Sequence, residues 1–144
     1  MRNLVKRLIW MKVYKSKTLK ISEEKDLLNA RSIIREYSDE AQLTQIQKIK
    51  LLTASSEIIR NILKYAGKGR VTLKILSDAK SGVEVICEDT GRGIEDMNAA
   101  MQKGFSTSGS LGLGLPGAKS LVNVFQIESK PSVGTRVRLI VWKT

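Results

Sequence analysis

The sequence contains no histidine and a single cysteine, Cys87, in 144 residues. The lack of histidine excludes Ser-His-Asp and Cys-His catalysis, and it excludes imidazole ligation of a metal. A single cysteine excludes an internal disulfide and favours a reducing compartment, so we expect a cytoplasmic protein. No apolar run approaches the roughly 18 residues that a membrane-spanning helix needs, and we therefore expect no membrane span.

The excess of basic residues is concentrated at the start of the chain. The formal net charge is +11, and seven basic residues precede the first acidic residue, Glu23. Those seven are Arg2, Lys6, Arg7, Lys12, Lys15, Lys17 and Lys20. We interpret residues 1–12 as a basic N-terminal extension and residues 13–144 as one domain. Other interpretations of the first segment are an amphipathic surface helix and an upstream start codon before Met11. Residues 21–144 carry the remaining charge of +4, and they lack the alternation of aromatic and basic residues that proteins binding single-stranded nucleic acid use. We therefore expect no nucleic-acid partner.

Hydrophobic periodicity predicts an α+β fold. Period-2 patterns predict strands at 13–21, 71–76, 83–88, 125–129 and 135–142. Helical spacing predicts a helix capped by Ser22 that ends near 38–39, a second helix from Leu43 to Tyr65, a short helix at 94–103 and one at 116–124. This order predicts a two-layer α/β sandwich, with the helices on one face of a mixed, mostly antiparallel sheet, rather than a regular βαβ repeat.

Glu57 and Asn61 lie four residues apart on the second predicted helix. That spacing places both side chains on one helix face, outside the apolar stripe that centres near Ser55 and Ile62. A carboxylate and an amide there could hold a divalent cation and orient a hydroxyl. For this pair taken alone, an ordinary solvated helix face is the favoured interpretation.

Three further segments carry glycine or hydroxyl groups where a ligand could approach the backbone. Asp89-Thr90-Gly91-Arg92-Gly93 directly follows a predicted strand, and its carboxylate could accept a hydrogen bond from an exocyclic amine such as that of adenine. The glycine-rich segment 104–117 opens onto a helix N-terminus, where backbone amides can bind an anion, and no Gly-Lys-Ser/Thr follows as in a Walker loop. Gly134-Thr135 precedes the last predicted strand. Simple turns or a flexible surface loop are the alternatives for these segments.

In this order the four segments resemble the GHKL ATPase family, whose nucleotide site is the Bergerat fold. Glu57 and Asn61 resemble its N box, Asp89-x-Gly91-x-Gly93 its G1 box, Gly112-Leu113-Gly114-Leu115 its G2 box and Gly134-Thr135 its G3 element. Within the family, Gly104-Phe105-Ser106-Thr107 and the segment 112–119 resemble the RsbT-type switch kinases of stressosomes, whose sister group is the anti-sigma-factor kinases. Sporulation-type members of that sister group carry an arginine, which helps to hold the γ-phosphate, where this chain has Ser110. Which group compensates the charge of the γ-phosphate in this chain is therefore left open.

The resemblance implies a role for each matching residue. Asp89 would accept a hydrogen bond from the adenine amino group, Thr135 would support adenine through water, and Asn61 would bind Mg²⁺ together with the phosphates of ATP. Glu57 would be the general base toward the substrate hydroxyl. The remaining nucleotide-binding positions would be Gly91, Gly93, Gly104, Ser106, Thr107, Gly112, Leu113, Gly114 and Leu115.

The function implied by this resemblance is an ATP-dependent serine/threonine protein kinase of a bacterial partner-switching stress-response pathway. It would phosphorylate STAS-domain stressosome proteins (RsbS- or RsbR-like) and activate a PP2C-type phosphatase (RsbU-like) by binding to it. Two alternatives stay open, namely an anti-sigma factor with serine kinase activity and an ATP-binding interaction module without kinase turnover. Histidine autokinase chemistry is excluded because the chain has no histidine.

Overall fold

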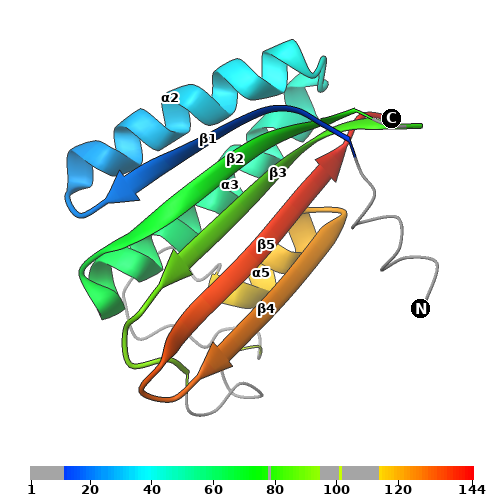
Figure 1. Ribbon diagram of the computed structural model, residues 1–144. Coiled ribbons are helices and arrows are strands. Elements are labelled where there is room, and N and C mark those ends of the chain that lie inside the picture. Colours follow the sequence, from blue (N-terminus) through cyan, green and yellow to red (C-terminus); the bar gives the residue numbers. More distant parts are fainter. Residues whose placement is uncertain (1–11, 78, 95–100, 102–113) are drawn as a thin grey trace.

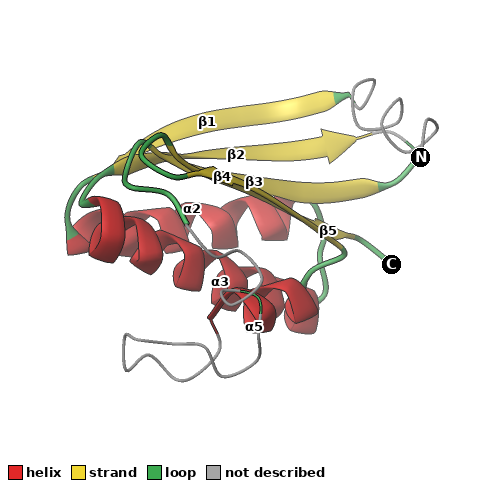
Figure 2. Ribbon diagram, turned by 90° about the horizontal axis from the view of Figure 1, so that it is seen from below, coloured by secondary structure: helices red, strands yellow, loops and turns green. Residues whose placement is uncertain are grey.

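The computed structural model describes residues 12–77, 79–94, 101 and 114–144. A five-stranded antiparallel sheet in the order β1-β2-β3-β5-β4 carries the helices α2, α3 and α5 on one face (Figure 1, Figure 2). The elements are β1 (Val13–Ile21), α2 (Glu24–Glu40), α3 (Gln45–Asn61), η1 (Ile62–Ala66), β2 (Gly69–Ser77), β3 (Ser81–Asp89), α5 (Gly114–Leu121), β4 (Val124–Lys130) and β5 (Gly134–Trp142). The predicted α+β sandwich is confirmed, and all described strand pairs are antiparallel.

The hydrophobic core lies between the sheet and the helices. Strand register aligns apolar residues in rows across the sheet, such as Leu73, Val85 and Leu139 in β2, β3 and β5, and all three are fully buried. The helices contribute Leu27 and Ile34 from α2, and Leu51 and Ile59 from α3, which are at most 1% exposed. Burial of this face provides the main stabilisation of the fold.

Helix ends differ from the prediction in local detail. The N-cap of α2 is Glu23 rather than Ser22, since Glu23 has an extended backbone and forms a capping box with Asp26. The Asp26 carboxylate accepts hydrogen bonds from the backbone amides of both Ser22 and Glu23 at 2.9 Å. These two bonds lower the pKa of Asp26 below its usual value. The predicted helix at 116–124 ends at Leu121, and Val124 already belongs to β4. The short helix predicted at 94–103 falls almost entirely outside the described residues.

The second predicted helix is divided into two parts. Thr44 caps α3, since its hydroxyl accepts from the Gln47 amide and the Gln47 side chain accepts from the Thr44 amide. At Ile62 the α-helix becomes a π-turn, which Gly67 closes by donating its amide hydrogen to Ile62 O at 2.9 Å. Gly67 ends the helical segment at a φ of 81°.

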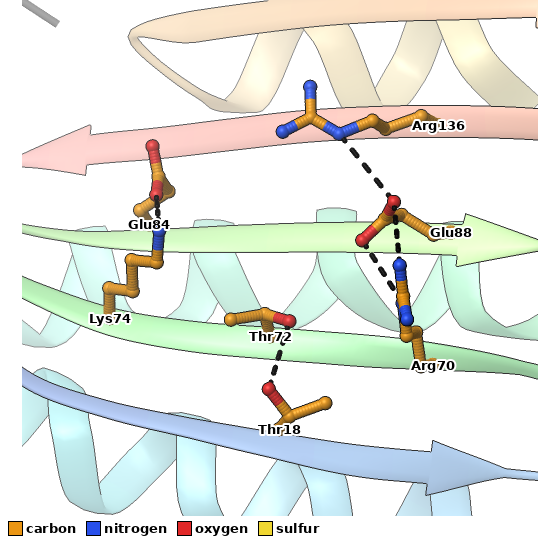
Figure 3. Close-up of polar contacts among 7 residues, drawn as sticks. All are labelled: Thr18, Arg70, Thr72, Lys74, Glu84, Glu88 and Arg136. Carbon is orange, nitrogen blue, oxygen red and sulfur yellow. Dashed lines mark hydrogen bonds and ion pairs between the residues drawn. The ribbon is translucent and has the colours of Figure 1, made fainter. Parts of the chain in front are cut away.

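The other face of the sheet carries cross-strand polar contacts (Figure 3). Glu88 in β3 lies between Arg70 of β2 and Arg136 of β5, and the hydroxyls of Thr18 and Thr72 are 3.2 Å apart. Glu84 pairs with Lys74 and Arg138 and is only 1% exposed. Within the described part of the chain, no helix is both long and apolar enough to cross a bilayer.

Candidate functional site

The predicted site residues Asp89 and Thr135 lie side by side at one end of the sheet. Asp89 is the last residue of β3, and its cross-strand partner in β5 is Thr135, whose own partner in β4 is Ser129. Directly opposed residues of antiparallel strands point to the same face. The three therefore continue the helix-covered face of the sheet, two residues beyond the core row of Cys87, Val137 and Ile127.

The Asp89 carboxylate is held in one orientation by the loop that follows it. Its Oδ1 accepts a hydrogen bond from the backbone amide of Gly91 at 2.9 Å. Among the described residues, Oδ2 has no hydrogen-bond partner, and the side chain is half-buried. An oriented carboxylate oxygen at the edge of an apolar layer is suited to accept a hydrogen bond from an amine.

Two glycines allow this loop to pass between its neighbours. A Cβ at Gly91 would lie 2.7 Å from the Ala66 methyl of η1. Gly93 has a φ of 74°, and a Cβ there would collide with the carbonyl oxygen of Lys130. The loop is thereby packed between the end of the α3–η1 helix and the β4–β5 hairpin, which explains why both positions require glycine.

Ser129 is a site residue that the sequence patterns did not indicate. Its Oγ accepts the amide hydrogen of Ile94 at 2.8 Å and lies 2.8 Å from the Thr135 hydroxyl and 3.2 Å from Gly134 O. The Ser132 amide adds a second link by donating to Arg92 O at 2.7 Å. No sequence signal identified Ser129, because its role depends on the pairing of β4 with β5.

The predicted pair lies on α3, whose continuation η1 contacts the same loop through Ala66. Asn61 is half-buried at the junction where α3 becomes the π-turn η1, a distortion that is frequent at functional sites. Glu57 was expected outside the apolar stripe, on a polar face, but it is only 5% exposed. The helix-face prediction failed because α3 packs against α2 on one side and α5 on the other, so more of its circumference is covered than one apolar stripe indicates (Figure 1).

A cationic and aromatic group connects η1 with the glycine loop, and the sequence patterns did not indicate it. The Arg92 guanidinium is 5.6 Å from the centre of the Tyr65 ring, and the Lys64 ammonium is 5.4 Å from it. These distances are within the range of cation–π attraction. The available signal was the Lys64-Tyr65 pair directly after the Asn61 turn, together with an arginine between two glycines.

The predicted phosphate loop is described only at its end. Gly114 is the first residue of α5 and has a φ of 49°, while Leu115 is buried in the core and anchors the helix. Gly104, Ser106, Thr107, Gly112 and Leu113 lie outside the described residues. Because α5 packs along α3, its N-terminus and the Glu57–Asn61 pair belong to the same helical layer (Figure 2).

The donor set near Asn61 fits Mg²⁺ only together with ligand oxygens. Within the described ranges, no group of three Asp, Glu or Cys residues could hold a metal ion by itself. Mg²⁺ commonly keeps several waters and binds through a few protein oxygens plus substrate phosphates. Asn61 is compatible with such a role and would be one protein ligand among phosphate and water oxygens.

Comparison with known proteins gives one family and two groups of relatives. Residues 46–144 match the family described as histidine kinase-, DNA gyrase B-, and HSP90-like ATPases. The chain is 40% identical over 125 residues to the serine/threonine-protein kinase RsbT of Bacillus subtilis (strain 168), covering 86% of this chain and 94% of that protein. It is 31% identical over 117 residues to the anti-sigma F factor of Caldanaerobacter subterraneus subsp. tengcongensis, covering 76% of this chain and 80% of that protein.

Two solved structures share the fold. A crystal structure of RsbU and RsbW domains from Mycobacterium tuberculosis matches with a TM-score of 0.59 and 18% identity, covering 88% of this chain and 31% of that longer chain. The SiaB–SiaC complex from Pseudomonas aeruginosa matches with a TM-score of 0.54 and 10% identity, covering 99% of this chain and 97% of the other. At these identities the likeness concerns the fold alone.

Proposed function

The chain belongs to the histidine kinase-, DNA gyrase B-, and HSP90-like ATPase family, and from this premise we propose that it is a serine/threonine protein kinase of a partner-switching pathway. The sequence match to the kinase RsbT spans nearly the whole of both chains. The observation that carries a nucleotide site is the Asp89 carboxylate, which the Gly91 amide orients and whose Oδ2 has no partner among the described residues. ATP is the phosphoryl donor in this proposal, and the cytoplasm is the compartment where it would act.

Asp89 and Thr135 would bind the adenine end of ATP. Asp89 Oδ2 would accept a hydrogen bond from the exocyclic amino group, which guanine lacks at that position. Thr135, its neighbour in the sheet, would hold a water against the same base edge. The glycine loop would allow the base to approach the backbone, with Gly91 packed on Ala66.

Glu57 and Asn61 would serve the phosphate end. Asn61 would contribute a ligand to Mg²⁺, which when bound offsets the charge that develops on the phosphates. Glu57, four residues earlier on the same helix face, would accept the proton of the attacking serine or threonine hydroxyl. The burial of Glu57 would keep water away from the transfer step. The loop 104–113 together with Gly114 and Leu115 would supply backbone amides to the phosphates.

STAS-domain proteins of the RsbS or RsbR type are the proposed substrates, and a PP2C-type phosphatase of the RsbU type is the proposed binding partner. The 31% identity to an anti-sigma F factor supports a second candidate, a kinase that also sequesters a sigma subunit. Incubation of the chain with labelled ATP and each candidate partner separates the two. Label on a STAS protein without capture of a sigma subunit supports the first function, whereas a stable sigma complex overturns it.

Two substitutions test the assignment of the site. Asp89→Asn should weaken ATP binding about tenfold or more, because the Asn side chain lacks the charge of the carboxylate and can turn its own NH₂ donor toward the adenine amino group, which is also a donor.

Glu57→Gln should leave ATP binding within about twofold and slow transfer by about a hundredfold, since it removes a general base. Calorimetry measures the first effect and single-turnover label transfer the second.

Glu88→Gln is the matched control for these variants. It is adjacent to Asp89 in β3 but points to the opposite face, between Arg70 and Arg136 (Figure 3). It should bind and transfer like the unaltered chain. Unchanged binding in Asp89→Asn contradicts the adenine assignment, and an unchanged transfer rate in Glu57→Gln contradicts the assigned base.

A further inference from the structure

We propose that Ser129 is a positioning residue for adenine recognition, acting through Thr135 and through the loop after Asp89. This inference rests on the proposed function, because it concerns the same nucleotide site. Ser129 lies in β4, and its row in the sheet continues through Thr135 in β5 to Asp89 in β3. It needs no direct contact with the nucleotide to act.

The hydrogen bonds of Ser129 determine what Thr135 can offer to a ligand. The Ile94 amide donates to Ser129 Oγ, and Gly134 O can only accept, so Ser129 donates its single hydrogen to that carbonyl. Either hydroxyl of the 2.8 Å contact between Ser129 and Thr135 has the geometry of a donor, and with the Ser129 hydrogen on the Gly134 carbonyl it is Thr135 that donates. With its hydrogen directed to Ser129 and no other partner for its hydroxyl among the described residues, Thr135 is an acceptor that matches the hydrogen of a water or of an amino group.

The same serine also fixes the far end of the glycine loop. Gly91 holds Asp89 at the start of the loop, and Ile94 is the first residue after Gly93. Between them, Ser132 of the hairpin donates to Arg92 O. Without the Ser129 hydroxyl, the half-buried Ile94 amide loses its acceptor and the loop loses one of its two hydrogen bonds to the hairpin. Asp89 and Thr135 would both lose their fixed positions as a result.

A pair of nucleotides separates positioning from general stability. ATP carries the 6-amino group, and purine riboside 5′-triphosphate is the same molecule without it. Ser129→Ala should weaken ATP binding about tenfold, the scale of a lost charge-assisted hydrogen bond, but should weaken binding of the analogue no more than about twofold to threefold. Ser129→Thr, which keeps the hydroxyl, should restore most of the affinity for ATP. Dissociation constants are measured by calorimetry on the full chain.

Thr72→Val is the matched control. It removes one hydroxyl from the Thr18–Thr72 pair, which is also a cross-strand hydroxyl pair but lies on the opposite face of the sheet (Figure 3). It should leave both dissociation constants unchanged. Ser129→Cys is a second variant of similar size, and it should reproduce the selective loss if Ser129→Ala folds poorly.

The outcomes distinguish the two proposals. If Ser129→Ala or Ser129→Cys weakens both nucleotides equally, or lowers only the melting temperature, Ser129 has a structural role and the inference is overturned. If the unaltered chain discriminates between the nucleotides and the variants keep that discrimination, the inference fails and the proposed function stands. If the unaltered chain binds both nucleotides equally, adenine recognition by Asp89 fails, and the role of Ser129 fails with it.

Discussion

Cys87, the only thiol of the chain, is placed where it should be chemically inert. It lies on the helix-covered face of β3 and is 1% exposed. Burial, reinforced by the nearby carboxylates of Glu88 and Asp89, raises the pKa of the thiol far above its usual value. We expect no labelling by an aromatic disulfide reagent at pH 8 in the folded protein and complete labelling in urea. Ser16→Cys, at an exposed position of β1, should add one thiol that reacts at once. Rapid labelling of the unaltered folded chain would contradict this burial.

The candidate site residues that the sequence patterns indicated differ from those that they did not indicate in how local their signal is. Asp89, Gly91 and Gly93 carry a local signal, because a carboxylate and two glycines directly follow a strand. Ser129 carries none, since a serine in an alternating strand has no special meaning until its partner in β5 is known. The burial of Glu57 was missed for a related reason, because helical periodicity reports one covered stripe and not a second neighbouring helix.

Strand β3 presents two glutamates on its open face that should contribute very differently to stability. Glu84 is 1% exposed and pairs with Arg138 and Lys74. The side chain of Glu88 is 29% exposed and pairs with Arg70 and Arg136 (Figure 3). Removing one partner of a buried pair leaves charges uncompensated, at a cost of about 3 kcal/mol. Exposed pairs contribute less than about 1 kcal/mol. Glu84→Ala should therefore lower the free energy of unfolding, measured in urea, by about 3 kcal/mol, and Glu88→Ala by less than about 1 kcal/mol. Equal losses would show that Glu84 is not buried as described.

The types and order of the elements were predictable because periodicity and turn residues agreed along most of the chain. The predicted strand at 13–21 coincides with β1, and the other four predicted strands lie within one or two residues of the observed bounds. The π-turn at Ile62–Ala66 was not predictable, since Leu63 and Tyr65 fit an α-helical spacing equally well. The N-cap of α2 is Glu23 and not the predicted Ser22, and the Asp26 carboxylate accepts hydrogen bonds from the amides of both residues.

The site itself is a consequence of strand order, which local patterns do not contain. β3 and β5 are neighbours although the last helix and β4 lie between them in the chain. That arrangement brings Asp89, Thr135 and Ser129 into one row, and the Gly91–Ala66 contact joins the row to the α3–η1 helix. Within the sequence, only the resemblance of the four motifs to a known family indicates that these segments form one site. For Asp89 and Thr135 the physical reason that they lie together is cross-strand register.

Because the site is shared by the helical layer, the loop after β3 and the β4–β5 hairpin, a bound nucleotide should stabilise the folded chain as a unit. A ligand that binds only the folded state at about one hundred times its dissociation constant adds about 2.7 kcal/mol. For a chain of this length, that corresponds to a rise in melting temperature of roughly 5–10 °C. We expect this rise with ATP and Mg²⁺ in scanning calorimetry, and a smaller one when a chelator removes Mg²⁺.

GTP at the same concentration should have much less effect, because it presents a carbonyl where adenine presents its amino group, and Asp89 can only accept. An equal rise with GTP, or an undiminished rise with ATP in Asp89→Asn, would show that the stabilisation comes from the phosphates alone.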